Sequence, residues 1–139
     1  MFGRNSNVRA VDTNILVRLL EQDDPAQTAA AEAFLQGGTA LWVSHLVLAE
    51  TIWVLQSVFK RTKKELLGVL DALVNNLEIH IHEPSVVSAA IAHFRSSKAE
   101  FSDCLALAIA QAQGHLPLAT FDKNLAKLPG TVLPKRRSN

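Results

Sequence analysis

Residues 8–20 read VRAVDTNILVRLL, and this stretch decides the fold. Val8 to Val11 is a short β-favouring run, interrupted by Arg9, and the apolar residues after Asp12 recur at helical spacing. A strand is therefore expected to end at Asp12 and to pass directly into a helix. In open α/β sheets, ligands bind outside the carboxyl ends of the strands. Asp12 is thus expected at the edge of the sheet where a functional site would lie.

The rest of the chain continues the alternation of strands and helices. Further strands are predicted over residues 41–43, 77–81, 118–120 and 131–133. Helices are predicted over residues 25–35, 44–59, 62–74, 84–95 and 102–113, with a turn of helix over 123–128. This order predicts an α/β fold, a three-layer α/β/α arrangement around a central, mainly parallel sheet.

Several local signals set the bounds of these elements. Asp24 followed by Pro25 predicts the start of a helix, and Thr62 with Glu65 predicts a capping box. Ser102 is expected to cap the helix that contains Asp103. In the 44–59 helix, Leu46, Ala49 and Trp53 step round at helical spacing and predict its apolar face. Leu77, Ile79 and Ile81 alternate with polar residues, which predicts a half-buried strand.

Length and composition are those of one compact domain. The chain has 139 residues, of which 48% are hydrophobic and 19% charged, so we expect a single domain over residues 1–139. Its core is expected over about residues 8–133, followed by a short basic tail, Lys135 to Arg137. The formal net charge of +1 gives no global attraction to nucleic acid. A polyanion would have to be held by bound cations or by a local basic patch such as residues 60–64 or the tail.

The sequence also predicts where the protein works. One cysteine, Cys104, excludes an intrachain disulfide and suits a reducing compartment. No apolar stretch reaches the roughly 20 residues that span a bilayer, and the amino end lacks the apolar core of a signal peptide. A cytoplasmic protein without a membrane partner is expected.

Four separated acids lie at junctions between the predicted elements. They are Asp12 in VDTN, Glu50 in LVLAET, Asp103 in FSDCLALAIA and Asp122 in LATFDKN. Carboxylate oxygens are the ligands that Mg²⁺ and Mn²⁺ prefer, and a cation would offset the repulsion among clustered carboxylates. Each acid also has a structural alternative. Asp12 and Asp122 could cap the segments that follow them, Asp103 could stabilise its own helix N-terminus, and Glu50 could face solvent.

These motifs, in this order, resemble the PIN-domain ribonucleases. VDTN, an acid in the helix after the second strand, the helix start FSDCLALAIA and TFDKNL match the family's pattern from Val8 to about Leu133. In size and order the chain is most similar to the VapC-type toxins of bacterial type II toxin–antitoxin systems. Cys104 stands where the family pattern favours a small residue such as alanine.

The resemblance implies a site, a cofactor and partners. The family's acidic quartet carries over onto Asp12, Glu50, Asp103 and Asp122, which would be catalytic and would hold Mg²⁺ or Mn²⁺. Thr13, Asn14 and Thr120 would support them by hydrogen bonds to the carboxylates or to a water molecule at the metal, although Asn14 could equally cap its own helix. The implied activity is metal-dependent endoribonuclease cleavage of RNA, with a cognate antitoxin protein as partner and a homodimer as assembly.

Two other functions remain open at the level of sequence. An aspartate-nucleophile phosphatase or phosphotransferase also begins with an acid at the end of its first strand, but it normally has a second acid two positions on, where this chain has Asn14. A non-catalytic PIN domain that binds RNA or a partner is the other alternative. The chain contains no GxSxG, GxxxxGK[ST] or HExxH motif, so the chemistry that these motifs support is not indicated.

Overall fold

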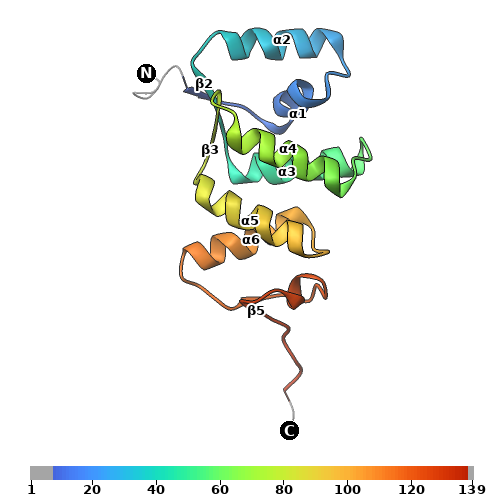
Figure 1. Cartoon of the computed structure of the whole chain (residues 1–139), viewed down its shortest axis with the longest axis vertical. Coiled ribbons are helices and arrows are strands. Elements are labelled where there is room, and N and C mark those ends of the chain that lie inside the picture. Colours follow the sequence, from blue (N-terminus) through green and yellow to red (C-terminus); the bar gives the residue numbers. More distant parts are fainter. Residues whose placement is uncertain (1–7, 138–139) are drawn as a thin grey trace. The chain divides into compact units, whose positions relative to one another are not determined.

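The computed structural model describes residues 8–137, and the chain divides into two compact units (Figure 1). The N-terminal unit comprises residues 1–84, and the C-terminal unit comprises residues 85–139. The expectation of a single domain over residues 1–139 stays a prediction.

The N-terminal unit contains a parallel sheet. Its strands are β1 (Val8–Ala10), β2 (Ala40–Val43) and β3 (Ile79–Ile81), in the order β1-β2-β3. Val8 pairs with Ala40 in the first ladder and Leu41 pairs with Ile79 in the second. The helices of this unit are α1 (Thr13–Glu21), α2 (Pro25–Gln36), α3 (His45–Ser57) and α4 (Lys63–Asn75). Parallel neighbours require crossover connections, and these helices supply them.

Arg9 interrupts the apolar run of β1, and its side chain binds the carbonyl groups at the C-terminal end of α2. Its guanidinium donates to the carbonyl oxygens of Phe34 and Leu35, in the last turn of α2, and lies 3.9 Å from the centre of the Phe34 ring. Exposed carbonyls at a helix C-terminus favour a cation. Gly38 leaves room for this contact, since a Cβ there would lie 2.5 Å from Arg9 Nη2.

The predicted helix starts of the N-terminal unit are confirmed. Asp24 caps α2 by accepting from the backbone N–H of Gln27, with Pro25 in the first turn. Thr62 and Glu65 form both bonds of the capping box at the start of α4. These bonds satisfy backbone donors that a helix leaves unpaired in its first turn.

Helix α3 forms where predicted but buries a different face. Leu48, Thr51, Ile52 and Leu55 are its buried residues, whereas Leu46 and Trp53 are exposed. The helix is apolar nearly all round, so several faces could be matched to a helical period. Burial follows the packing of α3 against α1 and α4.

The strand predicted over residues 77–81 begins later, at Ile79. Leu77 is 93% exposed, and the backbone N–H of Glu78 donates to Asn76 Oδ1 at 2.8 Å. This Asx turn diverts the chain before the strand begins. The prediction that Leu77 faces the core is therefore wrong, while Ile81 is buried as expected.

The C-terminal unit is built around two helices. They are α5 (Pro84–Ser96), which begins at the boundary residue, and α6 (Phe101–Ala112). Strands β4 (Leu118–Ala119) and β5 (Thr131–Val132) pair in parallel and flank the short 3₁₀ helix η1 (Leu125–Lys127). Ser102 is not the cap of α6, since Glu100 occupies the N-cap position and the helix starts at Phe101. Gly114 follows the helix at φ +78°, as its predicted stop requires.

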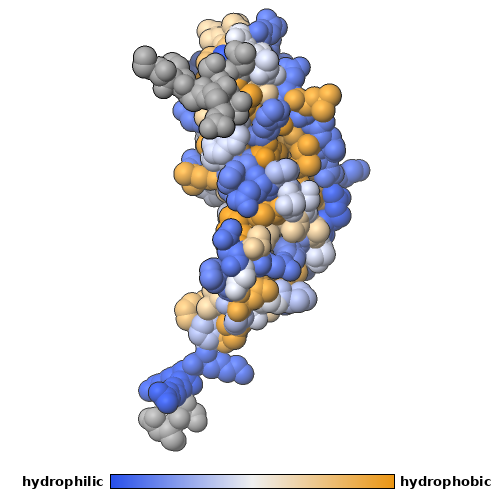
Figure 2. Space-filling model, turned by 90° about the vertical axis from the view of Figure 1, so that its left-hand side faces the viewer, coloured by the Kyte–Doolittle hydropathy of each residue, from blue (hydrophilic) through white to orange (hydrophobic). Residues whose placement is uncertain are grey.

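Across residues 8–137 the structure has six α-helices and only parallel strand pairs, which confirms the predicted α/β class. None of the described helices is both long and apolar enough to cross a membrane. The basic tail is exposed and has no regular structure up to Arg137; it forms the strongly hydrophilic stretch at the lower end of Figure 2.

Candidate acidic site

Asp12 lies at the carboxyl end of β1 and caps α1. Its Oδ1 accepts a hydrogen bond of 3.0 Å from the backbone N–H of Ile15, and its backbone is extended as an N-cap requires. The helix cap that the sequence allowed for Asp12 is therefore present. A carboxylate has two oxygens with about four lone pairs, so one capping bond leaves most of its acceptor capacity available.

Thr13 connects α1 to the second acid of the N-terminal unit. Its Oγ1 donates to Glu50 Oε2 at 3.2 Å, across 37 positions of sequence. Glu50 lies on the exposed side of α3, between the buried Leu48 and Thr51. The predicted link between Thr13 and a carboxylate is therefore present. Asn14 is exposed inside the first turn of α1, and the cap of that helix is Asp12.

Asp122 is held in a tight loop of the C-terminal unit. Its backbone N–H donates to Thr120 Oγ1 at 3.0 Å, and its Oδ1 accepts from the backbone N–H of Leu125 at 2.8 Å. The hydroxyl of Thr120 thus supports the fourth acid, Asp122, by accepting from the backbone N–H of Asp122. As at Asp12, the carboxylate caps the next segment with one oxygen and keeps further acceptor capacity.

Asp103 lies in the first turn of α6, where the sequence placed it. Its carboxyl is half-buried, and its pKa is raised above the ordinary value, first by burial and then by the negative charges of Asp122 and Glu100. Asp103 and Asp122 are therefore near enough to repel each other, although 19 positions separate them. Perturbed carboxyl groups of this kind are concentrated at functional sites.

Glu100 is an acid that the sequence analysis did not single out. It occupies the N-cap position of α6 without making a side-chain capping bond, and its charge contributes to the raised pKa of Asp103. Its position three residues before Asp103 was the available signal. The N-terminus of α6 therefore carries the negative charge of Glu100 in addition to that of the acids predicted from the sequence.

The structure places two of the four acids in each unit. Asp12 and Glu50 are both linked to the first turn of α1, and Asp103 and Asp122 interact electrostatically in the C-terminal unit. Over residues 8–137, no three His, Cys, Asp or Glu side chains are gathered so as to hold a metal ion. Magnesium is commonly held by only one or two carboxylates, with water and substrate phosphate completing its shell. Each pair fits that donor set, and the convergence of all four acids stays a prediction.

The basic residues at 60–64 are partly committed to other contacts. Arg61 forms a two-pronged ion pair with Glu21, with Nε to Oε1 at 2.8 Å, and a longer contact with Glu65. Hydrogen bonding to Glu21 raises the pKa of Arg61. Arg61 therefore joins α1 to the start of α4, and the other cations of this segment, Lys60, Lys63 and Lys64, are exposed.

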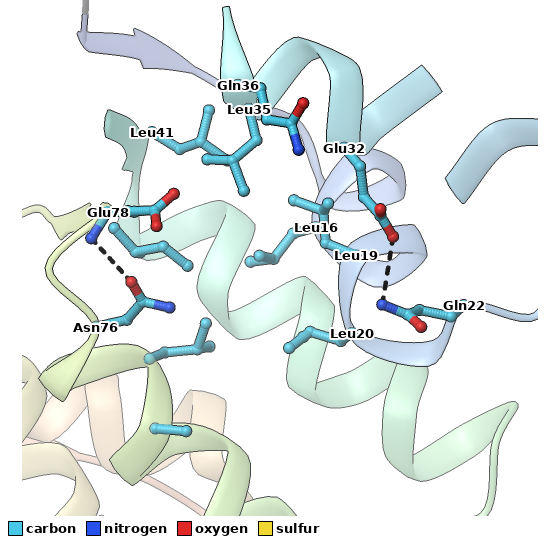
Figure 3. Close-up of a pocket in the computed structure, with 13 residues that line it drawn as sticks. Leu16, Leu19, Leu20, Gln22, Glu32, Leu35, Gln36, Leu41, Asn76 and Glu78 are labelled. Carbon is cyan, nitrogen blue, oxygen red and sulfur yellow. Dashed lines mark hydrogen bonds between the residues drawn. The ribbon is translucent and has the colours of Figure 1, made fainter. Parts of the chain in front are cut away.

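A separate pocket of about 520 Å³ lies in the N-terminal unit (Figure 3). Leucines from α1, α2 and β2 point into it, and polar side chains stand around them. The polar group is Gln22, Glu32, Gln36, Asn76 and Glu78. Neither Asp12 nor Glu50 lines this pocket, so it is distinct from the acidic site of the same unit.

Parallel strands with acids at strand ends and helix starts define a class of α/β proteins with an acidic site. Within that class, the family model of the PIN domain matches residues 9–130. The chain therefore belongs to the PIN domain family. PIN domains are generally nucleases and usually use divalent metal ions. The comparison with curated proteins finds no match.

The raised pKa of Asp103 predicts the stability of an Asp103→Asn variant. The folded carboxyl holds its proton more tightly than the unfolded one, so ionisation of Asp103 lowers the free energy of unfolding as pH rises. In EDTA near neutral pH, the variant should be at least as stable as wild type. The gain is up to about 1 kcal/mol, because solvent screens a half-exposed carboxyl. The gain should shrink as pH falls through the raised pKa of Asp103 and vanish below the ordinary pKa of an aspartate carboxyl, where both states are protonated.

Thermal melting of both proteins in EDTA, at neutral and at acid pH, measures this difference. Saturating Mg²⁺ should restore the wild type relative to the variant, because binding to the folded state stabilises it. Glu78→Gln, which removes an exposed acid of the other unit, should show neither effect. If Asp103→Asn melts well below wild type in EDTA, Asp103 is a structural charge at the α6 N-terminus.

Proposed function

We propose that the chain is a Mg²⁺- or Mn²⁺-dependent endoribonuclease that acts as the toxin of a toxin–antitoxin pair. The observation that carries the nuclease proposal is the half-buried Asp103 beside Asp122, in a chain whose PIN match spans residues 9–130. Proteins seldom retain such repulsion without a use for it. The toxin role rests on the order of the four motifs and on their resemblance to the VapC-type proteins.

Asp12, Glu50, Asp103 and Asp122 are the proposed metal-binding and catalytic residues. A divalent cation held there would offset negative charge on the phosphate and lower the pKa of the attacking water. The chain's own groups orient the carboxylates. Thr13 donates to Glu50, and the hydrogen bonds of the loop hold the backbone and one carboxylate oxygen of Asp122 in place. Asn14 and Thr120 are proposed as supporting polar groups. No side-chain nucleophile is needed for hydrolysis by water.

The matched pair Asp12 and Asp24 offers a sharp test of catalysis. Both cap a helix of the N-terminal unit through an Oδ1 bond of 3.0 Å, but only Asp12 is a proposed site residue. Asparagine caps about as well as aspartate, so neither substitution should lower stability much. Asp12→Asn should lower RNA cleavage by several orders of magnitude through loss of a metal ligand, whereas Asp24→Asn should cleave like wild type.

The assay is cleavage of a labelled single-stranded RNA with Mg²⁺, Mn²⁺, Ca²⁺ or EDTA. Cleavage should need Mg²⁺ or Mn²⁺ and stop in EDTA, while Ca²⁺ should support little turnover because of its looser coordination. Equal cleavage in EDTA would refute the metal mechanism. Trapping of a phosphoenzyme at Asp12 would favour a phosphatase or phosphotransferase instead, and metal-independent RNA binding without cleavage would favour a non-catalytic PIN domain.

The partner is proposed to be an antitoxin that presents Arg or Lys to the acids. The pocket of the N-terminal unit gives such a protein a second place to bind, since its leucine lining accepts apolar side chains and Glu32 and Glu78 attract cations. An amphipathic basic segment has this chemistry. A small protein encoded immediately upstream of this gene would be the candidate.

Co-expression with the upstream protein should neutralise the wild-type toxin. Reversing both pocket charges, as Glu32→Lys with Glu78→Lys, should weaken binding roughly 10-fold or more and restore growth arrest, because like charges now meet across the interface. Pull-down affinity and growth measure the two effects. Full neutralisation of the reversed variant would exclude the pocket, and toxicity unaffected by the upstream protein would contradict the antitoxin proposal.

A homodimer is also proposed, and exposed apolar side chains at α3 support it. Leu46, Trp53 and Val58 are all more than 60% exposed, and Leu46 and Trp53 lie seven positions apart on one side of the helix. Large apolar groups gathered on one element are typical of protein interfaces, where tryptophan is a frequent anchor.

Trp53→Lys should shift the chain from dimer to monomer at micromolar concentration. Loss of an interface anchor costs about 2 kcal/mol or more, which is roughly a 30-fold weaker association. Light scattering after gel filtration measures the mass. Leu77→Lys, at an exposed loop position, is the control and should remain dimeric. A monomeric wild-type chain at this concentration would contradict the proposal.

A further inference from the structure

Phe121 is an exposed aromatic residue in the middle of the acidic loop. Its side chain is 79% exposed, between Thr120 and Asp122. Leaving a phenyl ring in water forfeits roughly the stabilisation of a buried side chain. Its neighbours in sequence are the polar residues Thr120, Asp122 and Lys123, so the ring does not continue an apolar patch along the loop. In this it differs from Trp53, which accompanies other exposed apolar residues.

The backbone that carries the ring is fixed on its carboxyl side. Asp122 donates to Thr120 Oγ1 across Phe121, Leu125 donates to Asp122 Oδ1, and the backbone N–H of Ala126 donates to the Asp122 carbonyl at 2.9 Å. On the other side, the Thr120 N–H donates to the Val132 carbonyl beside the β4–β5 pair. The Cα of Phe121 is therefore positioned by bonds to both flanking residues, which lowers the entropy cost of using the ring in binding.

The ring lies one residue from a proposed metal ligand. Consecutive Cα atoms are about 3.8 Å apart, so the Phe121 ring and the Asp122 carboxylate leave the backbone at adjacent positions of the same loop. The exposed Lys123 follows Asp122 and offers a cation to a neighbouring phosphate. An apolar planar surface beside groups that act on phosphate matches the two parts of a nucleotide, the base and the phosphate.

We propose that Phe121 is a stacking platform for an unpaired base at the cleaved phosphate. The proposal rests on the nuclease function of the same site and names its substrate as RNA with a base free to leave its helix. Stacking on a phenyl ring tolerates every base, so Phe121 selects unpaired over paired RNA and leaves the sequence preference to other contacts. Phe121 is a substrate-positioning residue.

Phe121→Ala should weaken RNA binding and raise KM by roughly 5- to 150-fold, the range that follows from about 1–3 kcal/mol per stacked base. Phe121→Trp should bind at least as tightly as wild type, and Phe121→Leu should fall between because it keeps apolar area without a π-face. Leu77→Ala removes an exposed apolar side chain outside this loop and should change nothing.

The deciding arm replaces the nucleotide at the cut site by an abasic one. Removing the base should weaken binding to the wild type as much as Phe121→Ala does, and combining the two changes should add little more. The probes are a short single-stranded RNA, its abasic form and a fully paired duplex. Fluorescence anisotropy gives the affinities, cleavage kinetics give KM and kcat, and thermal melting confirms that each variant is folded.

The outcomes separate this inference from the proposed function. If the wild type does not cleave any RNA, the nuclease proposal fails, and the anisotropy comparison still decides whether Phe121 stacks on a base. If the wild type cleaves and Phe121→Ala binds intact and abasic RNA as wild type does, the stacking role is overturned. It is equally overturned if Phe121→Ala weakens both RNAs by the same factor or changes the mass of the assembly, because Phe121 is then a structural or interface residue.

Discussion

The unfavourable ionisation of the half-buried Asp103, beside the charges of Asp122 and Glu100, is the constraint on which the acidic site of the C-terminal unit depends. Burial and two neighbouring negative charges raise the pKa of Asp103, so the folded C-terminal unit keeps a group that disfavours its own ionised form. Helix α6 could instead have placed an uncharged residue in its first turn. A bound cation would turn this cost into binding energy, since repulsion among carboxylates disappears when they share a positive charge.

The structural and functional roles of the acids are compatible. Asp12 and Asp122 each use one oxygen to cap the segment that follows, and Thr13 binds one oxygen of Glu50. Local hydrogen bonds hold one oxygen of each carboxylate in place, while its remaining lone pairs stay available for a ligand. Capping is therefore compatible with the proposed metal binding, and a substitution at Asp12 must be judged against another capping aspartate, such as Asp24.

Local signals in the sequence predicted most of the fold and part of the site. The caps at Asp24 and Thr62, the strand at Val8 and the position of Asp103 each depend on residues a few positions apart. The errors had other causes. Helix α3 is apolar on most sides, so only packing decides that Ile52 is buried and Trp53 exposed. Leu77 was misplaced because an Asx turn interrupted an alternating pattern, and Glu100 was missed because it makes no capping bond and only its position three residues before Asp103 marks it in the sequence.

The proposal that Asp103 and Asp122 hold one cation can be tested within the C-terminal unit. Isothermal titration of Mn²⁺ measures this binding in the wild type, Asp103→Asn, Asp122→Asn and the double variant, each checked for folding. The account predicts that either single substitution weakens Mn²⁺ binding by at least about 10-fold, and that the double variant loses less than the sum of both because the two acids serve the same ion. Unchanged Mn²⁺ affinity in Asp103→Asn, together with loss of binding in Asp122→Asn, would contradict a shared site.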